Sequence, residues 1–564
     1  MFHRLVLTCA LLLAAPAWAA TFIVDSPDDY ADATPGDGIC AAAGGVCTLR
    51  AAIQEANALP GPDTIHFNLP SGGPRTIYPQ TGLPDITETL TIDGTSQPGN
   101  QPNNLAQGTN AVLLVGISGG DAGWAGLVFK PGSSHSTVRS LRITHFTGGQ
   151  GGIVIDGDNP GTPLEDIHIH GNFIGTYGSN DPNDVNGSLA NYPHGIYVTG
   201  NVRNVQIGDG TPASRNLIVG RDPGSAVTAA FGANDVRVYD NLIGTNPAGT
   251  QRVGTQVGVL VEEGARTVDV LGNTIGASHT GVLIRHGGTD PQGDANRIQG
   301  NRIGIGPSGE NIAGTEDGIH ITNAARPTMP FNNTIGGGTA QSDGNTIAHW
   351  GRNGVRVSRT NNPSGNMPLN VILGNRIFGN GALGIELIDQ TSNPPLGANP
   401  QDPPPPAING GQAAPYMTSA LIGGGGVQVG YHFSGPPGQA YYIEVFSNTA
   451  CDASGYGQGQ NLVARVILAD ASAGQHTLSL PPLLPGVVLT MTATAQSNDT
   501  PTQGTSEFSR CLAVGQTANP PGPNPPGQPG AHIAAVPTLG HAALALLGAL
   551  VGGLGLRSQR RKHS

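Results

Sequence analysis

The segment 258–285 reads GVLVEEGARTVDVLGNTIGASHTGVLIR and contains both patterns that organise this chain. The first pattern is Gly followed by alternating β-branched or aliphatic residues, as in GVLV at 258–261 and GVLI at 281–284. The second is Asn-x-Ile-Gly, as in NTIG at 273–276. The alternation predicts short β-strands whose first and third apolar side chains point inward. Gly and Asn suit the sharp corners between such strands because both tolerate a left-handed backbone.

The two patterns interleave from about residue 150 to about residue 390, at irregular intervals of roughly 25 to 40 residues. A repeat of this size, built from short strands and corners, predicts an all-β solenoid, and we interpret it as a right-handed parallel β-helix. Coils of such a fold stack about 4.8 Å apart, so corner Asn side chains are expected to bond one another along the stack. The predicted corner residues are Asn172, Asn241, Asn273, Asn301, Asn333 and Asn375.

The composition of the 564-residue chain agrees with stacked strands. Only 11% of the residues are charged, whereas Gly (87 residues) and Pro (46) are abundant. Helical bundles need more Leu, Glu and Lys. The formal net charge of −12 argues against nucleic acid or anionic lipid as a partner, because binding to phosphates needs a basic surface.

The N-terminus predicts export. Residues 1–19 combine a basic start, a short apolar core and an Ala-x-Ala cleavage signal, as in a signal peptide. Its removal leaves four cysteines, and an even number in an exported chain predicts disulfides. We favour Cys40–Cys47 and Cys451–Cys511 among the three possible pairings, because each pair lies within one predicted module. No Cys-x-x-Cys spacing supports metal binding, so no metal site is predicted for these cysteines.

The C-terminus, 536–564, predicts a membrane-spanning signal. An apolar run follows Val536-Pro537-Thr538-Leu539, and a basic cluster follows the run. A helix over 536–556 would rise about 31 Å, enough to cross a bilayer with the basic cluster left in the cytoplasm. The layout resembles the IPTL-CTERM sorting signals, although Val536 stands where that family has Ile. This resemblance implies an exosortase-like partner and transient anchoring in the inner membrane of a Gram-negative bacterium; an ordinary C-terminal anchor is the alternative.

A second resemblance lies before the repeat. Residues 47–57, CTLRAAIQEAN, resemble the CSLREA motif that opens many secreted bacterial β-helix proteins, with Thr48 and Ala51 in place of Ser and Glu. The segments 63–67 and 90–99 also match that family. The resemblance implies the β-helix architecture and says little about activity. Thr48 can cap a helix whose apolar face would cover the open end of the first coil.

These patterns divide the chain into modules. After the signal peptide we expect a cap region at 20–62 and the β-helix at 63–392. A Pro-rich linker follows at 393–411, and alternating short strands at 412–515 predict a small β-sandwich. A second Pro/Gly-rich linker, 516–535, precedes the C-terminal signal.

The Gly-led strands predict which residues face outward from one sheet. Their middle residues are Val154, Tyr197, Leu260, Leu283, His320, Arg356 and Glu386. We expect this column to be exposed, with Asp317, His320, Arg356 and Glu386 as its one dense ionisable group. No Ser/His/Asp arrangement stands out in the sequence. An acidic run beginning at Asp25 could hold Ca²⁺ but lacks the spacing of a known calcium loop.

Two functions follow from this interpretation. We favour a non-catalytic secreted or surface protein, adhesin-like or carbohydrate-binding, with glycans or a surface receptor as partner. The alternative is a polysaccharide lyase or glycoside hydrolase that uses the group around His320 on the exposed sheet face. The catalytic signatures of polygalacturonase-like enzymes are missing as a set, and fold alone cannot choose between the two.

Overall fold

The computed structural model describes residues 19–518 with internal gaps at 71–72, 159–160, 179–187, 287–294, 324–330, 338–342, 361–368, 390–407, 472–473 and 498–499. The described residues lie in one compact unit. The predicted signal peptide up to residue 18, most of the two predicted Pro-rich linkers and the predicted C-terminal signal lie outside the described residues. None of the described helices is both long and apolar enough to cross a membrane.

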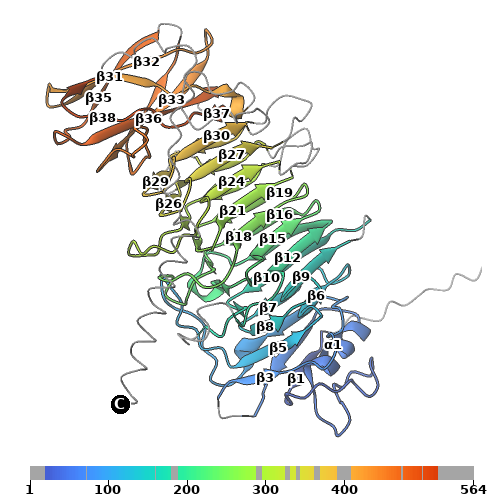
Figure 1. Ribbon diagram of the computed structural model, residues 1–564. Coiled ribbons are helices and arrows are strands. Elements are labelled where there is room, and N and C mark those ends of the chain that lie inside the picture. Colours follow the sequence, from blue (N-terminus) through green and yellow to red (C-terminus); the bar gives the residue numbers. More distant parts are fainter. Residues whose placement is uncertain are drawn as a thin grey trace, which may run out of the picture. The chain divides into compact units, whose positions relative to one another are not determined.

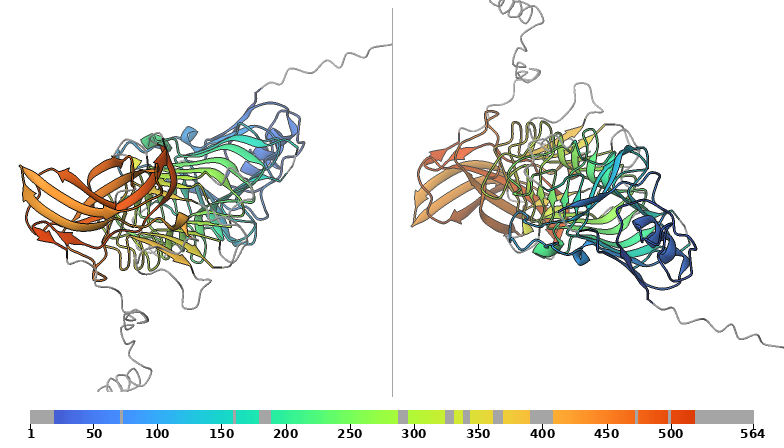
Figure 2. Two further views of the ribbon diagram at one scale, coloured as in Figure 1. Left: turned by 90° about the horizontal axis from the view of Figure 1, so that it is seen from above. Right: turned by 90° about the horizontal axis from the view of Figure 1, so that it is seen from below.

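Three parallel sheets form a β-helix-like body, in which strands of successive coils stack along the chain (Figures 1 and 2). The first sheet has 11 strands, the second 10 and the third 9. The first sheet contains β1 (Thr21–Val24), β2 (Asp63–Phe67), β4 (Leu90–Asp93), β7 (Thr137–Arg139), β10 (Leu164–His170), β13 (Val202–Ile207), β16 (Asn234–Tyr239), β19 (Arg266–Leu271), β22 (Arg297–Gln299), β25 (Thr334–Gly336) and β28 (Val371–Leu373).

The other two sheets follow the same order. The second sheet contains β3 (Arg75–Ile77), β5 (Val115–Ala122), β8 (Arg142–Phe146), β11 (Phe173–Ile174), β14 (Leu217–Ile218), β17 (Leu242–Ile243), β20 (Thr274–Ile275), β23 (Arg302–Ile303), β26 (Thr346–Ala348) and β29 (Arg376–Phe378). The third sheet contains β6 (Leu127–Phe129), β9 (Ile153–Gly157), β12 (His194–Gly200), β15 (Ser225–Ala230), β18 (Val257–Val261), β21 (Thr280–Arg285), β24 (Ile319–Thr322), β27 (Val355–Arg359) and β30 (Ile385–Asp389).

The Gly-led strands all lie in the third sheet, in register. Their first apolar residues are at most 2% exposed: Ile153, Ile196, Val259, Val282, Ile319, Val355 and Ile385. The predicted inward half of the alternation is therefore confirmed. Aliphatic side chains from the three sheets meet in one continuous core, which is the main source of stability in a fold of this kind.

Stacked asparagines line the corner between the first and second sheets. Asn273 donates from its backbone N and from Nδ2 to Oδ1 of Asn301, at 2.9 and 3.1 Å, and Nδ2 also donates to the carbonyl of Val238. The same pattern links Asn172, Asn216, Asn241, Asn273, Asn301, Asn345 and Asn375. All are buried, so the bonds satisfy backbone groups that water cannot reach.

Asn333 does not belong to this column, contrary to the expectation from its Asn-x-Ile-Gly motif. It accepts from Nδ2 of Asn296 and donates to Oδ1 of Asn370, at the corner that enters the first sheet. Asn409 extends that second column, and Asn345 takes the position expected for Asn333. The same four-residue motif suits both corners because each needs a buried amide before a short strand.

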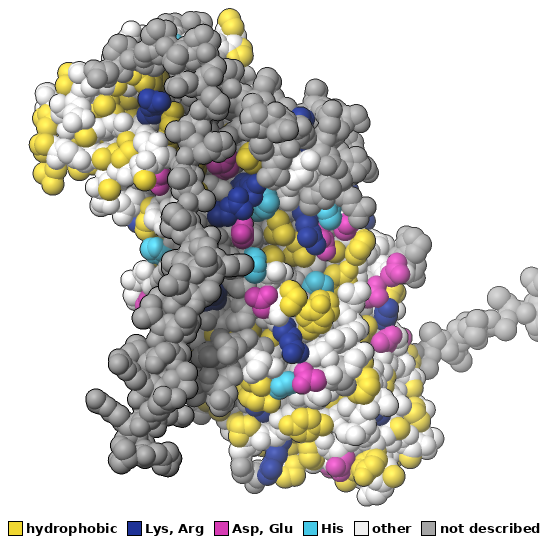
Figure 3. Space-filling view, viewed as in Figure 1, with side chains coloured by type: hydrophobic (Ala, Val, Ile, Leu, Met, Phe, Trp, Pro, Cys, Tyr) yellow, Lys and Arg dark blue, Asp and Glu magenta, His cyan; other side chains and the backbone are white. Residues whose placement is uncertain are grey.

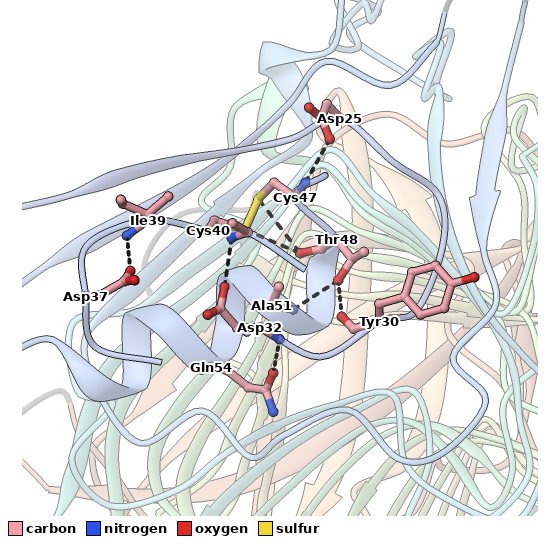
Figure 4. The surroundings of a disulfide bond; sticks show 11 residues. Asp25, Tyr30, Asp32, Asp37, Ile39, Cys40, Cys47, Thr48, Ala51 and Gln54 are labelled. Carbon is pink, nitrogen blue, oxygen red and sulfur yellow. Dashed lines mark hydrogen bonds between the residues drawn. A yellow bond between two sulfur atoms is a disulfide. The ribbon is translucent and has the colours of Figure 1, made fainter. Parts of the chain in front are cut away.

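The N-terminal end of the body is covered by α1 (Leu49–Ala58). Thr48 caps α1 by accepting a bond from the Ala51 backbone N, at 3.1 Å. The buried face of α1, which includes Leu49, Ile53 and Ala56, joins the core. Figure 4 shows how the disulfide Cys40–Cys47 ties the preceding loop to the start of this helix.

Two antiparallel sheets follow the coils, one of 4 strands and one of 5. Their strands are β31 (Tyr416–Gly423), β32 (Gly426–Phe433), β33 (Ala440–Asn448), β34 (Asn461–Leu468), β35 (Gly474–Leu480), β36 (Val488–Ser497), β37 (Thr500–Thr505), β38 (Leu512–Ala513) and β39 (Gln516–Thr517). They enclose a separate apolar core, and the second disulfide joins Cys451 to Cys511. Both predicted disulfides are thus confirmed.

The antiparallel sheets also close the last coil. Thr505 Oγ1 accepts from Ile372 N at 2.9 Å, and Glu507 Oε1 accepts from Leu387 N at 2.8 Å. Gln458 Oε1 accepts from Asn380 N at 3.0 Å. Strands β28, β29 and β30 are the last in their sheets, so these side chains take the place of a further coil.

Candidate functional site

The predicted ionisable group lies together on the outer side of the third sheet. His320 on β24 pairs in register with Arg356 on β27, which pairs with Glu386 on β30. Asp317 precedes β24, and its Oδ2 lies 3.6 Å from Arg356 Nη1 and 4.0 Å from His320 Nδ1. The coil spacing brings these residues together, as the sequence pattern suggests.

Most of the outward column is buried, and Leu283 and His320 are half-buried, which corrects the expectation of an exposed face. Tyr197 is 5% exposed, and Arg356 and Glu386 are each 7% exposed. The ring of His194 stacks on Tyr197 at 4.8 Å, and Val154 and Tyr197 belong to a small apolar cluster outside the main core. Strand periodicity predicts the direction of a side chain, but it does not predict what lies over it.

A Ser–His–Asp order, which the sequence did not reveal, occurs in this group. Ser358 Oγ lies 2.8 Å from His320 Nε2. The 4.0 Å between His320 Nδ1 and Asp317 Oδ2 is too long for a hydrogen bond, and Asn353 already donates twice to Asp317 Oδ1. Burial, assisted by the charge of Arg356, lowers the pKa of His320 to about 3. Such a group is a poor general base near neutral pH.

The exposed polar surface lies instead on the outer side of the first sheet. We define the first-sheet face as Arg139, His168, His170, Gln206, Arg237, Tyr239, Asp269 and Arg297. His168, Gln206, Arg237, Asp269 and Arg297 form one column, because each pairs in register with the next. Tyr239, which is 37% exposed, adds an aromatic ring beside it. Strands such as β10 alternate apolar and polar residues, and this was the signal available in the sequence.

Buried carboxylates hold the arginines of this face in place. Asp269 lies between Arg297, whose Nε donates to it at 2.7 Å, and Arg237, at 3.8 Å. The Arg297 side chain is 51% exposed and that of Asp269 only 5%. Arg139 pairs with Asp93 in the same way. Burial opposes ionisation of Asp93, but hydrogen bonds from Arg139 and Thr95 outweigh it and lower the pKa of this carboxyl.

One group at the margin of this sheet has the composition of a metal site. The candidate ligand atoms of His135, Glu165 and Asp166 all lie within 4.8 Å of one another. His135 Nδ1 and Asp166 Oδ2 are 2.8 Å apart, which an ion pair explains equally well. The His135 side chain is 61% exposed. Figure 3 shows a comparable pattern on the face it displays, where basic, acidic and histidine side chains lie in small mixed groups.

The carboxylates of the N-terminal acidic run bond to groups of the surrounding loop and of α1. Asp25 accepts from Cys47 N, and Asp32 from Thr34 N and Ala41 N. Asp29 pairs with Arg50. Within the described part of the chain these carboxylates order the loop around α1 (Figure 4).

Comparison with known proteins identifies a known motif near the C-terminus of the chain. Residues 534–561 match the IPTL-CTERM motif, which implies an exported surface protein handled by a sorting system. The tailspike protein gp49 of Acinetobacter baumannii bacteriophage Fri1, a capsular polysaccharide depolymerase, is similar over 81% of this chain and 80% of its own. The identity is 10% and the TM-score 0.20, too low to support a conclusion. A search among characterised proteins found no match.

Proposed function

We propose that this chain is a non-catalytic, adhesin-like protein of a Gram-negative cell surface that binds glycans along the first-sheet face. The proposal includes a CSLREA-type right-handed parallel β-helix followed by a β-sandwich. It also includes a C-terminal helix that anchors the chain in the inner membrane until an exosortase-like enzyme acts at Val536-Pro537-Thr538-Leu539.

The observation that carries the proposal is the contrast between two sheet faces. The third-sheet group around His320 is mostly buried and bonded internally, whereas the arginines and Tyr239 of the first-sheet face are exposed. Its side chains repeat once per coil, at about 4.8 Å. A row of Arg, His and Gln beside an exposed Tyr offers hydrogen-bond donors and a ring, which suits an extended polymer of hydroxylated or acidic units.

Binding of the full exported chain to immobilised polygalacturonate, alginate and dextran tests this proposal. Arg297→Ala and Tyr239→Ala should each weaken binding to the preferred polymer by roughly tenfold, since a charge-assisted bond or an aromatic contact is lost. Arg352→Ala is the matched control, because Arg352 is comparably exposed and pairs with Glu316. If both Arg297→Ala and Tyr239→Ala bind the polymer as tightly as the wild type, the first-sheet assignment is wrong. Release of reducing ends or unsaturated products would favour the polysaccharide-degrading alternative.

A further inference from the structure

A buried arginine on the outer side of the second sheet lacks a counter-charge among the described residues. Arg142, on β8, is 7% exposed. Its Nη2 donates to the carbonyl of Arg75 at 3.4 Å, and its buried Nε has no hydrogen-bond partner among the described residues. No carboxylate of the described part of the chain forms an ion pair with Arg142. Burial of an uncompensated guanidinium is costly, and structural arginines are normally paired.

The groups around Arg142 are those of a binding site. The guanidinium carbon lies 5.3 Å from the centroid of the Tyr177 ring, and Tyr78 is 53% exposed. Tyr78 lies two residues beyond Thr76, which pairs in register with Gly116 and so lies in the same row as Arg142. Burial lowers the pKa of Arg142, and the phenols of Tyr177 and Tyr78 partly oppose this effect. The His145 ring lies 6.4 Å from that of Tyr177, and its Nδ1 lies 3.3 Å from Ser118 Oγ.

Two glycines shape this surface. A Cβ on Gly116, which pairs with Arg142 in register, would lie 3.0 Å from Arg142 Nη2, so Gly116 leaves room beside the guanidinium. Gly178 has a φ of +68°, and a Cβ there would lie 2.1 Å from the Phe173 ring. The turn that carries Tyr177 can therefore lie directly against the sheet.

We propose that Arg142, Tyr177 and Tyr78 form a binding site for an acidic saccharide. The carboxylate of a uronic acid would pair with the unused N–H groups of Arg142, in the planar geometry that guanidinium and carboxylate share. The sugar ring would pack on Tyr177 or Tyr78, because a tyrosine side chain combines an apolar ring with a hydroxyl that can remain hydrated. This site is separate from the first-sheet face and does not depend on the function proposed for it.

Calorimetric titration of the full exported chain with trigalacturonate, galactotriose and inorganic sulfate tests the site. Trigalacturonate should bind, and neutral galactotriose should bind at least roughly tenfold more weakly, because the charge-assisted bonds are absent. Failure of wild type to bind trigalacturonate overturns the proposal. Sulfate binding as tight as trigalacturonate binding also overturns it, since the saccharide would then contribute nothing.

Three variants locate the binding. Arg142→Gln should lower affinity for trigalacturonate by at least roughly tenfold, and Tyr177→Ala should also lower it. Arg302→Gln is the matched control, because Arg302 occupies the corresponding position of β23 in the same sheet. Equal affinity of Arg142→Gln and wild type excludes the site. Tyr177→Ala decides the question in the same way if Arg142→Gln does not fold.

A stability measurement separates ligand binding from a structural role. Arg142→Met should melt at or above the temperature of the ligand-free wild type, because it replaces an unpaired buried charge with an apolar chain of similar length. A lower melting temperature would assign Arg142 to the architecture and overturn the proposal. Arg352→Ala, which lies outside both proposed sites, should leave trigalacturonate binding unchanged.

Discussion

Glu507→Gln should make the protein less sensitive to alkaline pH. Glu507 lies between the antiparallel sheets and the last coil, where its Oε1 accepts from Leu387 N. Its Oε2 is buried and has no hydrogen-bond partner in the described part of the chain. Burial, with the nearby charge of Glu386, raises the pKa of Glu507 from 4.5 to about 8. A neutral carboxyl is therefore the form that this junction accommodates.

The sign of the pH dependence follows from linkage. Because the folded pKa lies above the unfolded one, the folded state keeps a proton that the unfolded chain releases. This contribution to stability is complete below about pH 4.5 and is lost as pH rises through about 8. The difference between these two pKa values corresponds to an unfolding free energy of roughly 5 kcal/mol as an upper bound. Gln cannot ionise and keeps an oxygen acceptor for Leu387 N. The substitution should therefore remove most of the stability loss that occurs at alkaline pH.

Unfolding by urea at pH 5, 7 and 9, followed by fluorescence, measures the effect. Trp350 is a suitable reporter because it is buried and its backbone N donates to Asn380, which contacts the antiparallel sheets through Gln458. We expect the stability difference between pH 5 and pH 9 to shrink by a few kcal/mol in Glu507→Gln. Glu316→Gln, at an exposed ion pair, should change nothing. Superimposable pH profiles for Glu507→Gln and wild type would refute the reasoning.

Three further predictions concern the corner column, the second disulfide and the third-sheet group. Asn273→Ala should lower the unfolding free energy by roughly 2–4 kcal/mol, because it leaves buried amide groups unpaired, whereas Asn104→Ala at an exposed loop should cost little; chemical denaturation checks both. Joint replacement of Cys451 and Cys511 by Ser should cost about 4 kcal/mol, given a separation of 60 residues, and mass analysis of the wild type should find no free thiol. His320→Ala should leave glycan binding unchanged. Reduced binding by a folded His320→Ala variant would instead indicate that the third-sheet group binds the glycan.

Much of the fold could be predicted because its information is local and repeated. Every Gly-led strand lies in one sheet with its first apolar residue buried, as the period-2 alternation requires. Asn333 shows the limit of that reasoning. Its motif equals that of Asn273, yet it stands at the other corner, because a four-residue pattern does not record which of three sheets comes next.

The candidate sites were harder to predict than the fold. Alternation correctly grouped His320, Arg356 and Glu386, but it did not predict that Arg356 and Glu386 are buried and His320 half-buried. Arg142 depends on four strands or turns, since Tyr78, Gly116 and Tyr177 come from different coils. No short pattern contains such a group, and only the coil spacing brings it together.

The two ends of the β-helix-like body are closed by different chemistry, and this difference bears on the role of the antiparallel sheets. Helix α1 covers the first coil mainly with apolar side chains such as Leu49 and Ile53. The last coil is closed by polar acceptors, among them Thr505 Oγ1 and Glu507 Oε1, beside the apolar rings of Phe446 and Phe508. A polar closure satisfies strand-edge N–H groups that would otherwise pair with another chain. The antiparallel sheets therefore belong to the folding unit of the coils, beyond any role as a spacer. Deletion of residues 412–564 should produce an aggregating protein rather than a shorter soluble one, and a monodisperse, cooperatively melting truncated chain would contradict this argument.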